Sequence, residues 1–289
     1  MSLPPTLRPV NPHDSVDIVA LLDADGAVLF RGSGIEGAEQ FERFVSNHVS
    51  EWMGYVDRAS KRSAVSGRVL TSTDTPSAFS IPLHCESSFT ARWPQRIFFY
   101  CHTPATAGGR TPLADMRAVY RELDPELRAR FENEGVMYYR NFGPGVGLDW
   151  RDVFQVSDRA ALERYCASEA IRHEWLDADH LRTVQVRPAT LCHPRTGDRL
   201  WFNHALALHA SSLDPALRQT LLRQRGEAGL PHNTYFGNGD PIPDDAIEHV
   251  RQTHRSQQSL FDWQAGDVLM LDNLRMAHGR EPFSGPRAV

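Results

Sequence analysis

Three residues in this sequence have the types and spacing to bind one divalent metal ion: His84, Glu86 and His278. His84 and Glu86 are separated by one residue in IPLHCESSF, a run typical of a β-strand, where alternate side chains point to the same face. His278 follows a strongly apolar run, DVLMLDN. Two imidazoles and one carboxylate on one side of a metal ion leave the opposite positions open, as in non-haem Fe(II) sites.

This spacing is weak evidence when it is taken alone. A histidine and a glutamate separated by one residue arise by chance in many chains. An isolated histidine on a strand is also more often a hydrogen-bonded structural residue than a metal ligand. The prediction of a metal site therefore depends on the surrounding sequence.

The elements that must position the three residues are short predicted strands with helices inserted between them. Such an order favours a mainly β fold, a sandwich or barrel with helical additions, over an alternating β–α–β array. Predicted strands lie in AVLFRG, VSGRVLTST, IPLHCESSF, RIFFYCHTP, VQVRPATLCH, RLWFNH and DVLMLDN.

Two of the predicted helices begin in the same way. Asp124-Pro125 and Asp214-Pro215 each place an N-cap aspartate before a proline at the first helical position. Gly135 and Gly226 then stand where C-cap glycines are expected. Further helices are predicted near residues 41–48, 157–168 and 244–254, and the Gly-, Pro- and Asn-rich run 226–243 is predicted to be a long surface loop that could act as a lid.

Composition excludes several classes of protein. The chain has 289 residues, a formal net charge of -5 and scattered Lys and Arg, so a nucleic-acid partner is not expected. No apolar run is long enough for a transmembrane helix, and the first fifteen residues lack the pattern of a signal peptide. We therefore expect a cytoplasmic protein with a single domain over residues 1–289. Its four cysteines have no metal-binding spacing and should be reduced thiols.

Residues 65–289 resemble the taurine/2,4-D dioxygenase superfamily, and most of all its branch of syringomycin-type amino-acid hydroxylases in non-ribosomal peptide assembly. The resemblance depends on several blocks of sequence that occur in the same order as in the family, and no single block would be specific. They are the stretch from IPLHCESSF to TPLADMR, then GVMYYRNFG, RLWFNH, NTYFGNGDPIP and GDVLMLDNLRMAHGREPFSGPR. The resemblance implies a double-stranded β-helix, or jelly-roll, core flanked by helices.

The resemblance also implies a chemistry and a set of site residues. His84, Glu86 and His278 match the iron ligands, so the expected cofactors are Fe(II), the co-substrate 2-oxoglutarate, and O2. Thr111 matches the threonine that hydrogen-bonds 2-oxoglutarate. Arg287 matches the arginine that pairs with its distal carboxylate, because a guanidinium suits a carboxylate. Arg280 is the competing candidate for that role. The family normally continues beyond Arg287 into another strand, so the sequence is expected to stop short of the usual end.

The substrate is less determined. The resemblance implies hydroxylation of an unactivated C–H in an amino acid, free or tethered to a carrier protein, with release of succinate and CO2 in secondary-metabolite biosynthesis. Asn203 and His209 in WFNHALALH match a block near the active site. Each could contact substrate, but Asn203 could equally be a turn residue and His209 a core histidine.

Alternatives remain within and outside this chemistry. A desaturase on the same scaffold is one, and a non-catalytic cupin-like binding protein is another, which the presence of all three ligands disfavours. Related halogenases replace the carboxylate ligand by a small residue, so Glu86 argues against halogenation. Oligomeric state is not readable from the sequence.

Overall fold

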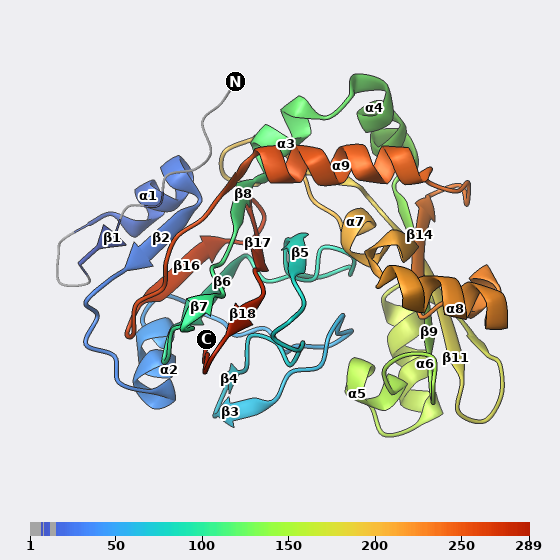
Figure 1. Ribbon diagram of the computed structural model, residues 1–289, viewed down its shortest axis with the longest axis horizontal. Coiled ribbons are helices and arrows are strands. Elements are labelled where there is room, and N and C mark those ends of the chain that lie inside the picture. Colours follow the sequence, from blue (N-terminus) through green and yellow to red (C-terminus); the bar gives the residue numbers. More distant parts are fainter. Residues whose placement is uncertain (1–6, 8, 12–15) are drawn as a thin grey trace.

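The computed structural model describes residues 7, 9–11 and 16–289, so the expectation about a signal peptide falls largely outside it. Two four-stranded sheets form the centre of the fold, and their strand orders are β1-β2-β16-β6 and β15-β8-β17-β5 (Figure 1). The first sheet contains β1 (Pro9–Val10), β2 (Ala27–Phe30), β16 (Val268–Asp272) and β6 (Arg96–Tyr100). The second contains β15 (Gln258–Ser259), β8 (Leu113–Asp115), β17 (Met276–Arg280) and β5 (Ile81–His84).

Alternation along β2 explains how the first sheet is buried on both faces. Ala27 and Leu29 pack in one cluster with Leu113 of β8 and Met276 of β17, which belong to the second sheet. The intervening side chains pack against helices α1 (Ile18–Asp25) and α2 (Ala38–Ser46) on the outer face. Because both faces are covered, the strand is a continuous apolar run rather than an alternating one.

A third sheet packs on the other side of the second, with the order β10-β11-β9-β14 and antiparallel pairing throughout. Its strands are β9 (Val136–Phe142), β10 (Arg172–Trp175), β11 (Leu181–Arg187) and β14 (His232–Phe236). The prediction of a long loop over 226–243 is wrong, because residues 232–236 pair with β9 along their whole length. Phe236 is buried. Its neighbours in the sequence are mostly polar, so the sequence did not indicate a buried strand.

The helix-capping predictions are confirmed. Asp124 and Asp214 accept hydrogen bonds from the backbone N–H of Leu127 and Leu217, at 2.8 and 2.9 Å. The helices are α3 (Met116–Glu122), α4 (Pro125–Glu134), α5 (Trp150–Phe154), α6 (Arg159–Ser168), α7 (Ala205–Leu208), α8 (Pro215–Arg225) and α9 (Asp244–Ser256). The remaining elements are β3 (Ala64–Ser66), β4 (Val69–Leu70), β7 (Ala107–Gly108), β12 (Thr190–Cys192), β13 (Arg199–Trp201), β18 (Phe283–Ser284), η1 (Ala210–Ser212) and η2 (Glu227–Gly229).

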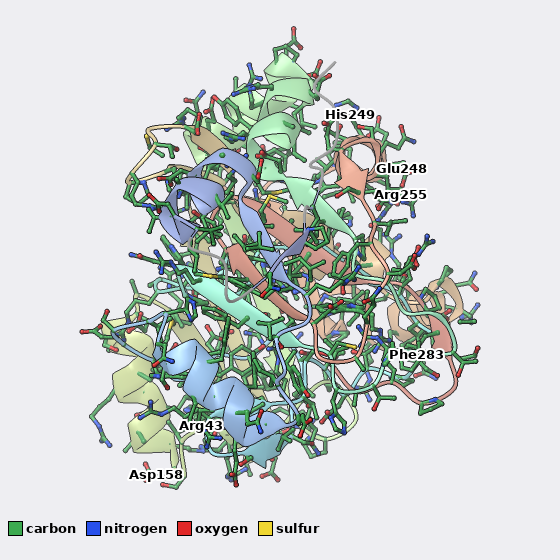
Figure 2. The ribbon with its side chains drawn as sticks, turned by 90° about the vertical axis from the view of Figure 1, so that its left-hand side faces the viewer. Arg43, Asp158, Glu248, His249, Arg255 and Phe283 are labelled. Carbon is green, nitrogen blue, oxygen red and sulfur yellow. The ribbon has the colours of Figure 1, made fainter. Side chains whose placement is uncertain are left out.

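The surface carries charges of both signs (Figure 2). Arg43 on α2, Asp158 before α6 and Arg255 near the end of α9 are all exposed. Within the described residues, no helix combines the length and apolarity that crossing a bilayer requires. All four cysteines are free thiols, as expected, and only Cys192 is exposed. The β-rich core of facing sheets with surrounding helices agrees with the predicted jelly roll.

Candidate metal centre

The two histidines of the predicted site face each other across neighbouring strands of the second sheet. His278 on β17 is the direct partner of His84 on β5, and their ring centroids are 4.5 Å apart. Directly opposed residues on antiparallel strands have side chains close enough to act together. The pairing of two strands that lie almost two hundred residues apart in the chain therefore creates the site.

Glu86 reaches the same place by a different route. Strand β5 ends at His84, so Glu86 lies beyond it, and Ser87 has a left-handed backbone with φ 57°. Asn273 fixes the backbone of Glu86: its Oδ1 accepts from Glu86 N at 2.7 Å and its Nδ2 donates to Glu86 O at 3.0 Å. The same amide donates to Pro94 O at 2.7 Å. Alternation along a strand explains the placement of His84, whereas Asn273 explains that of Glu86.

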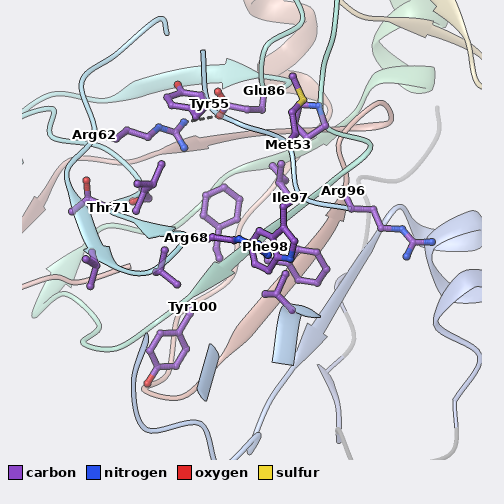
Figure 3. A pocket seen from close by; sticks show the side chains of 18 of the residues that line it. Met53, Tyr55, Arg62, Arg68, Thr71, Glu86, Arg96, Ile97, Phe98 and Tyr100 are labelled. Atoms are coloured by element: carbon purple, nitrogen blue, oxygen red, sulfur yellow. Dashed lines mark hydrogen bonds and ion pairs between the residues drawn. The ribbon is translucent and has the colours of Figure 1, made fainter. Parts of the chain in front are cut away.

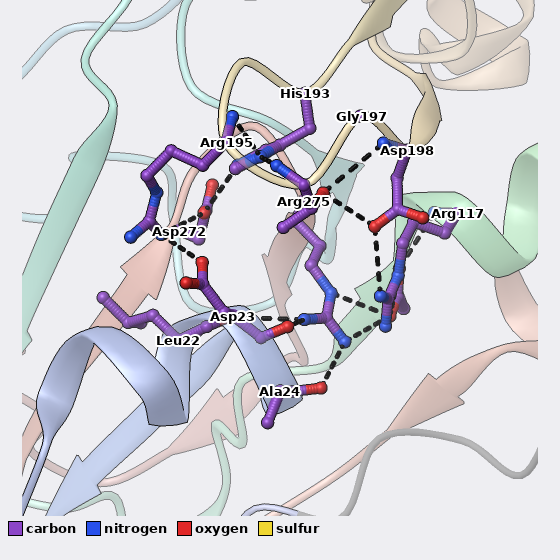
Figure 4. A network of polar contacts seen from close by, with 12 residues as sticks. Leu22, Asp23, Ala24, Arg117, His193, Arg195, Gly197, Asp198, Asp272 and Arg275 are labelled. Atoms are coloured by element: carbon purple, nitrogen blue, oxygen red, sulfur yellow. Dashed lines mark hydrogen bonds and ion pairs between the residues drawn. The ribbon is translucent and has the colours of Figure 1, made fainter.

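The residues 272–275, which join β16 to β17, hold several other parts of the chain (Figure 4). Arg275 donates to the carbonyls of Leu22, Asp23 and Ala24 at the end of α1, and it pairs with Asp115 at 2.9 Å. Asp115 also caps α3 and pairs with Arg117, so these two residues have a structural role. Further along, Asp272 accepts a hydrogen bond from His193 Nε2 at 2.9 Å.

His84, Glu86 and His278 each offer a ligand atom, and these atoms lie within 4.8 Å of one another. They are the one group of this kind in the part of the chain that the structure describes. The sequence expectation that these three residues come together agrees with this geometry.

The protonation of these residues also fits a metal ion. His84 Nδ1 lies 2.8 Å from the carbonyl of Pro82, which can only accept, so Nδ1 carries a proton and Nε2 is the nitrogen available to a metal ion. Burial holds the pKa of His278 well below its usual value, so this imidazole is neutral. Burial opposes ionisation of Glu86, but the positive charges around it, with Arg62 the largest contributor, together outweigh burial and lower its pKa to about 2. Two imidazole nitrogens and a carboxylate oxygen are a donor set suited to Fe(II).

A small cavity of about 80 Å³ adjoins the histidines, and Thr111 and both candidate arginines, Arg280 and Arg287, line it. The indole Nε1–H of Trp263 donates to Thr111 Oγ1 at 3.0 Å. Because that bond occupies a lone pair of the hydroxyl oxygen, the hydroxyl proton is left for an acceptor in the cavity. Thr111 is therefore oriented as a donor.

The two candidate arginines differ in how their guanidinium groups are used. Arg280 donates to the carbonyls of Thr75, Pro76 and Phe79 at 2.7–2.9 Å, so it is occupied by the backbone. Arg287 donates to Gly109 O at 3.1 Å and pairs with no carboxylate among the described residues. Burial and then the charge of Arg280 lower the pKa of Arg287 to about 10. The geometry favours Arg287 as the group that receives an anion.

Asn203 and His209, the predicted substrate residues, are engaged elsewhere. Asn203 donates to Ala189 O at 2.7 Å and accepts from Ala205 N at 2.9 Å, which favours the turn role. His209 is buried, and its Nδ1 accepts from Ser211 N at 3.2 Å at the start of η1. Neither residue lines the small cavity beside the metal ligands.

A much wider cleft, of about 1440 Å³, adjoins the small cavity, and Arg62, Arg280 and Arg287 line both. Strand β6 and much of the 48–75 segment line the wide cleft, and Glu86 and Arg62 lie together at its wall (Figure 3). Residues 226–243 line neither cavity, whereas residues of the 48–75 segment line both.

Three residues near the site were not identified from the sequence: Arg62, Asn273 and Trp263. Arg62 lies before the span of the family resemblance, and its ion pair with Glu86 crosses 24 residues of chain. Asn273 lies in a matched block, but its partner Glu86 is 187 residues away. The Trp263 partner Thr111 is 152 residues away. Only a co-varying pair in related sequences could have indicated such contacts.

Replacing Asn273 by Asp should weaken metal binding, because a carboxylate keeps the shape of the amide but cannot donate to Glu86 O and Pro94 O. We expect the affinity for Mn(II) to fall about 10–100-fold, as is common when a group supporting a ligand is lost. Titration of the protein with Mn(II), followed by the loss of the free-ion EPR signal, measures this. Asn238→Asp, at an exposed position, is the control. Equal affinities in both variants would contradict the positioning role.

Replacing Trp263 by Phe should raise the KM for 2-oxoglutarate about 2- to 12-fold, the equivalent of one neutral hydrogen bond. The ring remains, but the Thr111 hydroxyl is free to turn its proton away from the cavity. Steady-state succinate formation against 2-oxoglutarate concentration measures the effect. Trp175, on β10 of the third sheet, donates from its indole to Glu163 of α6, and Trp175→Phe should leave the KM unchanged. A matching rise in that control would refute the orientation of Thr111 by Trp263.

Comparisons with known proteins agree with the geometry. The family model described as taurine catabolism dioxygenase TauD, TfdA family matches residues 4–289. The dapdiamide synthesis protein DdaC of Enterobacter agglomerans is 40% identical, over 96% of this chain and 84% of that protein. A clavaminate synthase-like protein of Arabidopsis thaliana is 30% identical, over 93% and 82%.

A solved structure shows the same fold at low identity. It is that of a putative α-ketoglutarate-dependent 2,4-D dioxygenase from Burkholderia xenovorans, with a TM-score of 0.52 and 15% identity. The likeness covers 96% of this chain and 88% of that one. It supports the same fold over that part of the chain.

Proposed function

Because the chain belongs to the TauD/TfdA family of Fe(II)- and 2-oxoglutarate-dependent dioxygenases, we propose that His84, Glu86 and His278 hold its Fe(II). The observation that carries the proposal is the convergence of these three ligand atoms within 4.8 Å of one another. Thr111 and Arg287, on the wall of the adjoining cavity, would hold 2-oxoglutarate. We propose further that residues 1–289 act as one domain.

Each residue has a definite task in this proposal. When bound, the Fe(II) with O2 and 2-oxoglutarate supplies the oxidation of a C–H bond to C–OH, with release of succinate and CO2. Arg287 binds the distal carboxylate, because its buried guanidinium pairs with no carboxylate among the described residues. Thr111 donates a hydrogen bond from its hydroxyl group to the same co-substrate. The 48–75 segment limits the access of water to the site.

The proposed substrate is an amino acid or an aminoacyl group on a carrier protein, in secondary-metabolite biosynthesis. The relative at 40% identity is named for the synthesis of dapdiamide, which supports a biosynthetic role. The cleft beside Glu86, at about 1440 Å³, exceeds the roughly 300–1,000 Å³ of pockets for drug-sized ligands. A cleft of that size has room for the longer, carrier-bound form.

A turnover screen tests this proposal. Purified protein with Fe(II), 2-oxoglutarate and O2 is offered free amino acids and the same aminoacyl groups as carrier-bound thioesters. We expect succinate formation coupled to a product heavier by one oxygen atom, with the thioesters preferred. A product lighter by two hydrogens would identify a desaturase, and coupled turnover with free amino acids alone would refute the carrier-bound form.

A further inference from the structure

Arg62 lies against the carboxylate of Glu86 and has no counterpart in the metal-ligand pattern. Its Nη2 is 2.6 Å from Glu86 Oε2, and both side chains are largely buried, with exposed fractions of 16% and 10%. The guanidinium also stacks on Tyr55, 4.3 Å from the ring centroid (Figure 3). Two contacts on different groups fix its orientation, so Arg62 is directed at one oxygen of Glu86.

The part of the 48–75 segment that carries Arg62 is itself anchored. Asp57 has a left-handed backbone, φ 56°, and pairs with Arg140 of β9 at 2.5 Å, with both side chains buried. Arg140 also donates to Arg58 O at 2.6 Å, and Arg58 N donates to Val153 O at 3.2 Å. A buried ion pair and two backbone contacts hold the chain a few residues before Arg62. The arrangement at Glu86 is therefore built into the fold.

The Glu86 side chain needs such a partner more than an aspartate would. Glutamate has one more rotatable bond than aspartate, so its carboxylate has more positions available to it. Carboxylates bind divalent ions through one oxygen or through both. With two histidines, a carboxylate bound through one oxygen leaves the positions that the co-substrate and O2 require, and a carboxylate bound through both removes one of them.

We propose that Arg62 is a positioning residue that restricts Glu86 to binding the metal through one oxygen. The guanidinium occupies Oε2, and a metal ion on that same oxygen would bring two cations together at short distance. Oε1 is then the oxygen for the ion. This inference rests on the proposed ligand set, and it assigns to the 48–75 segment the task of keeping one coordination position open for 2-oxoglutarate.

The test compares Arg62→Gln and Arg62→Lys with the unmodified protein, using Mn(II) and 2-oxoglutarate as probes. Glutamine removes the charge at similar length, and lysine restores it. Broadening of the Mn(II) EPR signal in ¹⁷O-enriched water reports the number of water molecules on the bound ion. We expect Arg62→Gln to hold Mn(II) at least as tightly as the unmodified protein, with one water fewer, and Arg62→Lys to match the unmodified protein.

Binding of 2-oxoglutarate to the Mn(II)-loaded proteins, measured by calorimetry, gives the second readout. We expect the affinity of Arg62→Gln to be about 10- to 100-fold lower, with recovery in Arg62→Lys. Lys61→Gln removes a cation from the preceding, exposed residue and should change neither the water number nor either affinity.

The outcomes separate this inference from the ligand set on which it rests. An unchanged water number in Arg62→Gln would overturn the role of Arg62, even if 2-oxoglutarate binding fell through loss of a direct contact. A parallel loss of Mn(II) affinity would also overturn it, because Arg62 would then merely hold the carboxylate in place. If the unmodified protein and a His278→Ala variant bound Mn(II) equally, the ligand set itself would be refuted.

Discussion

Replacing His278 by Ala should abolish Fe(II)-dependent formation of succinate. The variant loses one of two imidazoles in a three-ligand site, and no other cluster of metal-binding side chains exists in the described part of the chain to replace it. A buried neutral imidazole is exchanged for a methyl group, so the fold should survive. Succinate formation, Mn(II) stoichiometry and the Tm of the metal-free protein, measured together, separate loss of the site from unfolding.

His173→Ala is the matched control for this prediction. His173 lies on β10 of the third sheet and is exposed. The His173→Ala variant should retain full Mn(II) stoichiometry and turnover. Unchanged turnover in His278→Ala would refute the metal assignment, and equal losses in both variants would show that the assay reports protein damage rather than the site.

Replacing Arg287 by Ala should raise the KM for 2-oxoglutarate by about 30- to 5,000-fold. The estimate corresponds to about 2–5 kcal/mol for a buried hydrogen-bonded charge pair that loses one partner. Arg287 is suited to this effect because its guanidinium lines the small cavity and lies against only one backbone carbonyl in the described structure. The KM of Arg287→Lys should lie between those of the unmodified protein and Arg287→Ala, because lysine retains the charge but lacks the planar guanidinium.

Arg280→Ala is the informative comparison. It strips the donors from three backbone carbonyls near residues 75–79, so its main effect should be on stability. We expect a lower Tm with a much smaller change in KM for 2-oxoglutarate. If Arg280→Ala raised KM strongly and Arg287→Ala did not, the two assignments would have to be exchanged.

Local signals predicted much of this fold. Aspartate before proline gave the starts of α4 and α8, and continuous apolar runs gave β2 and β16, because these features act within a few residues. Strand β14 was missed because its HNTYF sequence is set among turn-forming residues, while its partner β9 is distant in the chain. Tertiary pairing overrides local propensity in such strands.

The sequence likewise predicted part of the candidate site and missed the contacts between distant residues. The types of His84, Glu86 and His278 were readable, and the family resemblance placed Thr111 and Arg287 beside them. Sequence could not show that β5 ends at His84, so that Asn273 rather than strand alternation places Glu86. Nor could it show that the guanidinium of Arg280 serves the backbone. Such assignments depend on which donors and acceptors meet across long separations.

The 272–275 turn has a consequence for engineering this scaffold. Asp272, Asn273 and Arg275 contact three separate parts of the chain, which are the hairpin region at His193, the backbone of Glu86, and the end of α1. A change at any one of these residues removes contacts to a distant part of the chain, so a mutagenesis library should leave this turn unaltered. Exposed positions of the wide cleft, such as Arg68 and Met53, offer a place to vary substrate preference without that cost.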